Sequence, residues 1–87
     1  MRTDARLLPW TGPEGQPCFL VTDGDGYLSR AADAVESVQV EMAVGLLDHS
    51  AAMLEERQVT KAELLFLVAR MREAMADVLR IAESRRL

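Results

Sequence analysis

The fold is decided by a short stretch in the second half of the chain, residues 57–63, which reads R-Q-V-T-K-A-E. Thr60 and Glu63 form a capping-box pattern, in which the Thr60 hydroxyl caps the amide of Glu63 and the Glu63 carboxylate caps the amide of Thr60. The pattern predicts that one helix ends near Arg57 and that the next begins at Lys61. Because so short a connection turns the chain back on itself, we expect an antiparallel helical hairpin.

The two predicted helices span about residues 29–57 and 61–85. Ser29 is the expected N-cap of the first helix, because its hydroxyl can accept a hydrogen bond from an amide in the first turn. Asp33 and Glu36 follow in the early turns, where the helix dipole favours acidic side chains.

Composition divides the chain near residue 28. All three prolines and every glycine except Gly45 precede that point, which makes the first part rich in turns and leaves the rest free to form helix. The sequence therefore predicts a mainly α, single domain over residues 1–87. An extended or β-hairpin segment (1–28) precedes the helical hairpin (29–87).

The first segment contains two short candidate strands, residues 7–10 and 18–22, separated by turn-forming residues. Pro9 has no N–H to donate, so the first strand must be an edge strand or irregular. A run of D-G-D-G at 23–26 suggests a calcium loop. The EF-hand spacing, however, would place Val21 and Ala32 at two ligand positions, so we interpret the run as a turn.

Apolar residues occupy more of both helices than one buried face requires. The first helix carries a main stripe at steps of four and three, and a second stripe formed by Val40, Val44, Leu47, Ala51 and Leu54. The second helix carries Leu64, Val68, Met71, Met75, Val78 and Ala82 on one stripe, with further leucines beside it. A surface helix needs an apolar face about 100° wide. The surplus predicts a homodimer that forms a four-helix bundle.

The surplus apolar residues define a set of interface candidates. Gln39 and His49 interrupt the main stripe of the first helix and would fix the register of the bundle. Phe66 lies away from the main stripe of the second helix, so it either contacts Trp10 or Phe19 or lies in an interface. The candidates are Trp10, Phe19, Met42, Leu46, His49, Met53, Phe66, Met71 and Met75.

Charge is distributed unevenly along the chain. Residues 31–69 carry seven acidic and two basic side chains, whereas residues 70–87 carry five basic and three acidic ones. In an antiparallel hairpin the end of the second helix lies beside the start of the first. Arg80 and Arg85 are therefore expected to face Asp33 and Glu36.

Composition also excludes several classes of function. The chain has 87 residues, one cysteine and one histidine, and its net charge is −4. These residues form no motif for a metal, a cofactor or a catalytic group, so we predict that the protein is not an enzyme and binds no cofactor. The acidic balance argues against nucleic acid as a partner, and no apolar run is long enough to cross a membrane. Cys18 is expected to be a buried, inert thiol.

A longer segment carries a resemblance. Residues 9–20 read P-W-T-G-P-E-G-Q-P-C-F-L, and Y-L-S at 27–29 and I-A-E-S-R at 81–85 extend the pattern. The chain is similar to a group of small uncharacterised proteins of actinobacteria, especially streptomycetes. Its lysine-poor, arginine-rich composition suits a high-GC genome. The resemblance implies a cytoplasmic bacterial protein and carries no activity with it.

Two functions remain open from the sequence. The first is a small, non-enzymatic interaction or regulatory module that acts as a homodimer through protein–protein contacts, with another protein as a further partner. The alternative is a small-ligand or metal binder that uses a cavity at the helical interface near His49, Met53, Cys18 and Trp10. A closed apolar pocket of about 300 Å³ or more would favour the second function.

Overall fold

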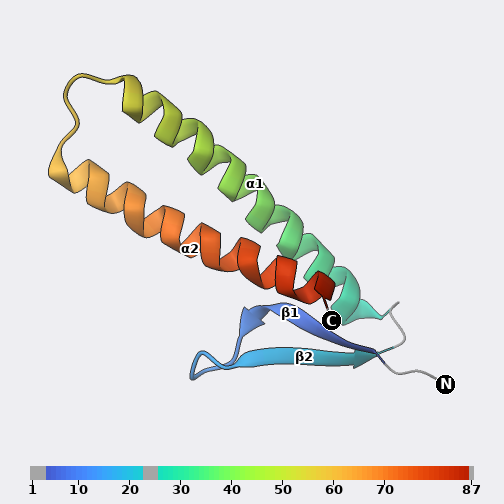
Figure 1. Ribbon diagram of the computed structural model, residues 1–87. Coiled ribbons are helices and arrows are strands. Elements are labelled where there is room, and N and C mark those ends of the chain that lie inside the picture. Colours follow the sequence, from blue (N-terminus) through green and yellow to red (C-terminus); the bar gives the residue numbers. More distant parts are fainter. Residues whose placement is uncertain (1–3, 23–25, 87) are drawn as a thin grey trace.

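A computed structural model describes residues 4–22 and 26–86 of the chain. Two strands, β1 (Asp4–Thr11) and β2 (Pro17–Thr22), are followed by two helices, α1 (Tyr27–Glu55) and α2 (Lys61–Arg86). The predicted order of a β-hairpin followed by two helices is confirmed (Figure 1). Of the predicted turn at 23–26, residues 23–25 lie outside the described residues.

The β-hairpin is a two-stranded antiparallel sheet with an irregular centre. Leu7 pairs with Phe19 and Thr11 pairs with Pro17, so residues 8–10 of β1 lie opposite a single residue of β2. Pro9 is within this bulge, which accommodates a residue that cannot donate a ladder hydrogen bond. The turn closes through Gly15, whose φ of 80° lies in the left-handed region that glycine adopts without strain.

Helix α1 begins earlier than the sequence indicated. Gly26, not Ser29, is the N-cap, and the amide of Arg30 donates to the Gly26 carbonyl at 3.2 Å. Ser29 is only 2 % exposed, and its hydroxyl makes no hydrogen bond with any described residue. The N-cap prediction was wrong because Ser29 is needed on the packed side of α1, one turn inside the helix. Helix α1 ends at Glu55, two residues before the expected end.

The start of α2 confirms the capping box. The Glu63 amide donates to the Thr60 hydroxyl at 3.1 Å, and the Thr60 amide donates to the Glu63 carboxylate at 3.4 Å. The Thr60 hydroxyl itself donates to the same carboxylate at 2.9 Å. Thr60 and Glu63 thus form hydrogen bonds with each other's backbone or side chain. These local contacts fix the start of α2.

The helices form a long antiparallel pair, and the β-hairpin lies against one end of it, opposite the 56–60 connection (Figure 1). Among the described residues, the buried apolar side chains are few: Leu7, Leu8, Pro9, Ala32, Met53 and Leu67. The molecule measures 59 × 25 × 21 Å, and its radius of gyration is 16.4 Å. A compact chain of this length has a radius of gyration of about 12 Å. The described helices include none with the length and apolar character needed to span a bilayer.

Candidate functional site

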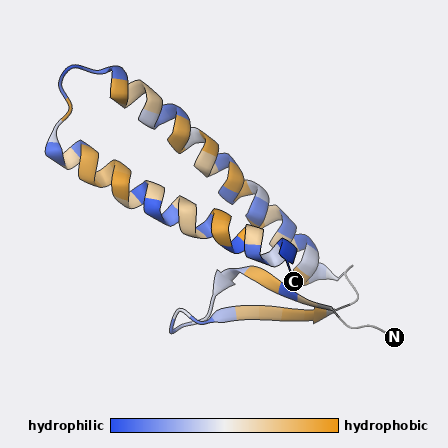
Figure 2. Ribbon diagram, in the orientation of Figure 1, coloured by the Kyte–Doolittle hydropathy of each residue, from blue (hydrophilic) through white to orange (hydrophobic). Residues whose placement is uncertain are grey.

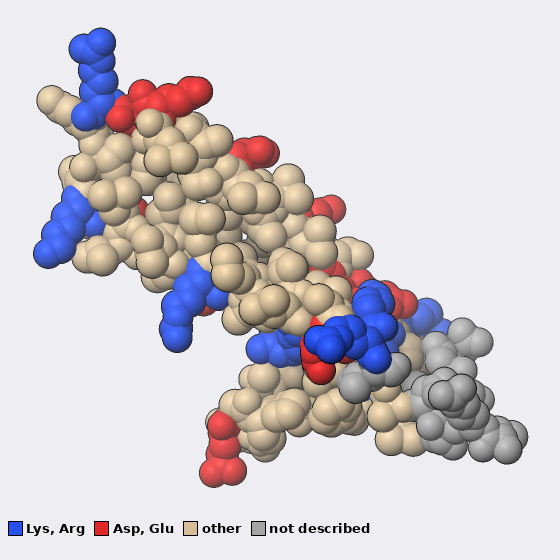
Figure 3. All heavy atoms as spheres, in the orientation of Figure 1, with Lys and Arg blue, Asp and Glu red and all other residues tan. Residues whose placement is uncertain are grey.

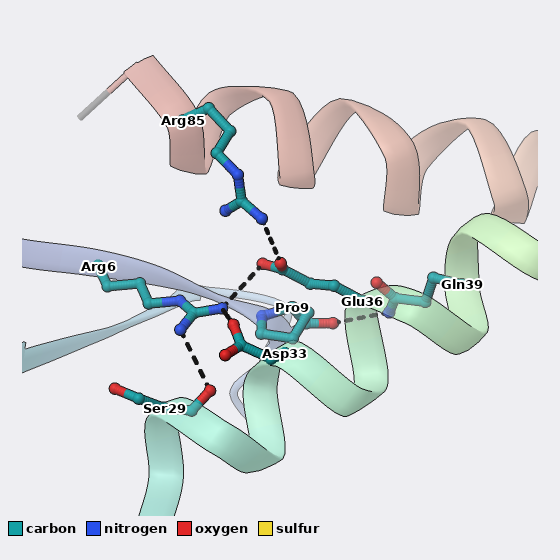
Figure 4. A network of polar contacts seen from close by, with 7 residues as sticks. All are labelled: Arg6, Pro9, Ser29, Asp33, Glu36, Gln39 and Arg85. Carbon is teal, nitrogen blue, oxygen red and sulfur yellow. Dashed lines mark hydrogen bonds and ion pairs between the residues drawn. The ribbon is translucent and has the colours of Figure 1, made fainter. Parts of the chain in front are cut away.

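The most buried charge in the described chain joins three elements at the end of the helix pair. The Glu36 side chain of α1 is 6 % exposed and accepts a hydrogen bond from Arg85 of α2 at 2.7 Å. Its second oxygen lies 3.4 Å from Arg6 of β1, which makes an ion pair without hydrogen-bond geometry. Figure 4 shows both guanidinium groups converging on this carboxylate. We call Arg6, Glu36 and Arg85, with the contacts that flank them, the polar junction.

Arg6 makes the largest number of contacts in the polar junction. It donates to Asp33 at 2.7 Å and to the Ser29 carbonyl at 3.2 Å (Figure 4). Partial burial lowers the pKa of Arg6, but the hydrogen bond to Asp33 and the negative charges of Glu36 and Asp33 outweigh this effect and raise the pKa above its ordinary value. Arg6 therefore stays charged and holds β1 against the start of α1.

Gln39 completes the contact between β1 and α1. Its amide nitrogen donates to the Pro9 carbonyl at 2.9 Å, within the strand bulge. The predicted role of Gln39 was to fix register between two copies. In the structure it instead satisfies a carbonyl of its own chain.

The charge prediction at this end of the molecule was right for one arginine of two. Arg85 reaches Glu36 across the helix pair, as the antiparallel arrangement predicts. Arg80 instead pairs with Asp77, three residues earlier on the same helix, at 3.2 Å. Because the polar junction ties three elements together through paired charges, we assign it a structural role.

The second feature is an apolar surface that runs along both helices on one side. Its α1 members are spaced by three, four or seven residues, and all but one step between its α2 members has one of these lengths, so each set follows one helix face. Between 39 % and 87 % of each side chain is exposed. We call this surface the open face; its members are Val40, Val44, Leu47 and Leu54 of α1 and Leu64, Val68, Met75, Val78 and Leu79 of α2.

A shallow hollow shows that these two stripes form one surface. Leu47 of α1 and Met75 and Val78 of α2 line a depression of about 180 Å³ between the helices, together with Leu46 and Met71. Figure 2 shows apolar residues along the full length of both helices. The open face therefore continues across the gap between α1 and α2.

Charged residues border this apolar surface with opposite signs. Glu41, Asp48 and Glu55 recur every seven residues along the outer edge of α1, whereas Lys61 and Arg72 lie eleven residues apart on the outer edge of α2. All five are exposed, and none pairs with another described residue. Figure 3 shows uncharged side chains between an acidic row along α1 and a basic row along α2. We call these rows the acidic edge and the basic edge.

Exposure along one line of α1 shows where the open face begins. Ser29, Glu36, Val40, Leu47 and Leu54 lie within about 40° of one another around the helix. Their exposed fractions rise from 2 % and 5 % at the polar junction to 45 %, 62 % and 87 % towards the 56–60 connection. One continuous line is thus covered by the chain itself at one end and by nothing in the described chain at the other.

The opposite side of the helix pair carries a separate group. His49, Met53 and Phe66 line a hollow of about 390 Å³ with Ala62 and Glu63. Leu47 and His49 are two residues apart, hence about 200° apart around α1, so this hollow and the open face point in different directions. The Phe66 ring also receives the guanidinium of Arg70 at 5.8 Å, in a cation–π contact.

The predicted site residues do not form one site. Leu46, Met71 and Met75 meet in the hollow of the open face, whereas His49, Met53 and Phe66 meet on the opposite side. Met42 is 57 % exposed, on the flank of α1 that faces away from the open face. Trp10 is half-buried in β1, and Phe19 is 52 % exposed on β2.

The four residues predicted to surround a ligand cavity lie at two different ends of the molecule. Trp10 and Cys18 belong to the β-hairpin, whereas His49 and Met53 lie towards the 56–60 connection at the other end of the helix pair (Figure 1). One chain therefore does not gather the four residues around a single cavity. Phe66 lies with His49 and Met53.

The candidate list left out most of the open face. Val40, Val44, Leu47 and Leu54 of α1 belong to it, and their signal was present in the sequence as a second apolar stripe. The stripe was recognised, but its residues were treated as surplus and the main stripe was taken as the interface.

No protein-family model, curated protein or solved structure matches the chain. Among the described residues, no group of three or more histidine, cysteine, aspartate or glutamate side chains is arranged to hold a metal ion.

Proposed function

We propose that the protein is a non-enzymatic interaction module that works as a homodimer, in which two helical hairpins join through the open face as a four-helix bundle. The observation that carries the proposal is the open face itself, a continuous apolar surface bordered by charge. Large apolar patches with a polar rim are typical of protein contact sites. Because most soluble oligomers are two-fold homo-oligomers, a second copy is the simplest partner.

The exposed area supports this proposal quantitatively. The single chain exposes 6871 Å². A compact monomer of its mass exposes about 5,100 Å², so the chain has a surplus of roughly 1,800 Å². A stable protein interface buries about 800 Å² per partner. The surplus is therefore more than enough for a dimer interface along the helices.

The position of the β-hairpin also favours the open face. Strand β1 packs against the last part of α2. Arg6 of the same strand contacts Ser29, Asp33 and Glu36, at the start of α1. Among the described residues, the polar contacts of the β-hairpin with α1 thus end before Val40, and the open face is unobstructed by the β-hairpin from Val40 to Leu54.

A dimer built this way leaves apolar side chains for another protein. Val38, Met42 and Phe66 are 54 %, 57 % and 67 % exposed on the flank away from the open face. We propose that this flank gives the module its contact with a further protein. We also propose that the protein acts in the bacterial cytoplasm, because its composition and the resemblance described above imply that location.

The alternative ligand-binding function has less support. The apolar hollow of about 180 Å³ is below the range of about 300–1,000 Å³ typical of small-molecule pockets. The hollow of about 390 Å³ beside His49 and Met53 is within that range, but Glu63 contributes to its lining, and Trp10 and Cys18 do not. A larger hollow of about 530 Å³ lies beside the polar junction, but Asp33, Glu36 and Glu41 contribute to its lining. Such a surface suits solvent better than an apolar ligand.

The mass of the protein in solution tests the proposal. Light scattering after size exclusion, at several concentrations, should give twice the 9.6 kDa of one chain. A monomer at every concentration would refute it.

Two matched variants then locate the interface. Val44 and Val38 are both on α1 and are 53 % and 54 % exposed, but only Val44 belongs to the open face. Val44→Glu should dissociate the dimer, because a carboxylate would be buried without a partner. Val38→Glu should leave the mass unchanged. The reverse result would contradict an interface on the open face.

A further inference from the structure

The proposed dimer, on which this inference rests, can close in two ways that both bring open face against open face. With the two-fold axis parallel to the helices, α1 of one copy lies over α2 of the other, and both β-hairpins lie at the same end. With the axis across the helices, α1 lies over α1 and α2 over α2, and the β-hairpins lie at opposite ends. Both arrangements are isologous, so symmetry alone does not choose between them.

The charged edges distinguish the two arrangements. In the parallel-axis arrangement, the acidic edge of each copy (Glu41, Asp48 and Glu55) meets the basic edge of the other (Lys61 and Arg72). In the crossed arrangement, acidic edge meets acidic edge and basic edge meets basic edge, at any position along the helices. Like charges placed together discriminate against an arrangement more strongly than isolated surface pairs stabilise one.

The parallel-axis arrangement also fixes which charges meet. Glu36 pairs with Arg85, and Leu47 lines one hollow with Met75, so these pairs mark positions at the same level of α1 and α2. Because α1 and α2 run in opposite directions, each step along α1 matches one step back along α2, which places Asp48 level with residues 73–74 of α2. Arg72 is therefore within about 3 Å of Asp48, measured along the helix axis. A two-fold axis parallel to the helices preserves level, so Asp48 of one copy meets Arg72 of the other.

We propose that a second copy of this chain binds the open face with its two-fold axis parallel to the helices, so that Asp48 pairs with Arg72 of the partner copy. Glu83, the acidic residue on the basic edge, does not oppose this arrangement, because it already pairs with Arg86 at 3.6 Å. The dimer then carries both β-hairpins at one end and both 56–60 connections at the other.

A distance between two labels tests the arrangement. Gln58 is exposed in the connection, so Gln58→Cys in a Cys18→Ser background takes a spin label without disturbing a helix. Pulsed electron resonance on the labelled dimer should give a distance below about 25 Å, because both connections are at one end. The crossed arrangement, with its axis at the centre of the open face near Leu47, would give about 30 Å or more, because Gln58 is eleven residues from Leu47 and each helical residue rises about 1.5 Å.

Charge reversal provides an independent test of the same geometry. Asp48→Arg should raise the dissociation constant of the dimer about tenfold or more, because two pairs become repulsive. The double variant Asp48→Arg with Arg72→Asp should restore it. Glu73→Arg, the same reversal on the side of α2 away from the open face, should leave the dissociation constant within about twofold.

The outcomes separate this inference from the proposed function. A monomer by light scattering overturns both. A dimer with a long label distance, or one that the double variant fails to restore, overturns the arrangement and leaves the dimer standing. A dimer with a short distance and a restored double variant supports both.

Discussion

Replacing Glu36 by glutamine tests whether the polar junction holds the β-hairpin to the helices. The change keeps the volume of the side chain and removes its charge. Two arginines, Arg85 at 2.7 Å and Arg6 at 3.4 Å, then lose their common partner. Because Glu36 is 6 % exposed, water cannot replace it on the buried side of the junction.

The size of the effect follows from how sheltered each contact is. Removing one member of a fully buried ion pair costs about 3–5 kcal/mol. Arg85 is 61 % exposed and Arg6 is 21 % exposed, so solvent screens part of the interaction and lowers this figure. We expect Glu36→Gln to reduce the free energy of unfolding by about 2–3 kcal/mol.

Urea unfolding followed by circular dichroism measures this loss, at a fixed protein concentration because a dimer's stability depends on concentration. One matched variant serves as the control: Asp33→Asn removes a carboxylate of the same network that is 66 % exposed. It should lower the free energy of unfolding by less than about 1 kcal/mol. If Glu36→Gln costs no more than this control, burial of the carboxylate does not stabilise the junction and the reasoning fails.

Three further substitutions test the local structure by the same unfolding measurement. Thr60→Ala removes the cap of α2 and should lower the free energy of unfolding by about 1 kcal/mol. Gln58→Ala, in the same connection, should lower it by less than about 0.5 kcal/mol. Equal effects of the two substitutions would argue against the cap. Gly15→Ala forces a Cβ into a left-handed conformation and should cost about 1 kcal/mol, and an unchanged midpoint would contradict that turn. Leu67→Ala should cost about 2–4 kcal/mol because Leu67 is 8 % exposed, and a smaller cost than Leu65→Ala, at 59 % exposure, would contradict the packing of α2.

The parts of the fold that the sequence predicted depend on neighbouring residues. Thr60 and Glu63 are three residues apart, so their reciprocal contacts could be inferred without any knowledge of the rest of the chain. The contact between Glu36 and Arg85 spans 49 residues. It was still predictable, because an antiparallel hairpin with a known turn fixes which ends of the helices meet.

The parts that the sequence did not predict depend on how the β-hairpin docks. Ser29 has the character of an N-cap, but its position in the packed end of α1 moves the cap to Gly26. Arg6 is in a segment with no periodic pattern, so nothing in the sequence places it beside Asp33 and Glu36. The burial of Glu36 required both arginines, and only one of them could be assigned from the sequence.

The open face shows most clearly why a helical pattern alone does not locate an interface. Ser29, Glu36, Val40, Leu47 and Leu54 follow one line on α1 and stay within about 40° of one another around the helix. At the polar junction this line is covered by contacts with Arg6 and Arg85, and those contacts do not extend to Val40. The apolar residues of this line are therefore exposed because the covering contacts end at the polar junction, and a partner is needed only from Val40 onwards. Binding of a second copy that begins at Val40 would leave the polar junction intact, so Glu36→Gln should destabilise the fold without changing which face associates.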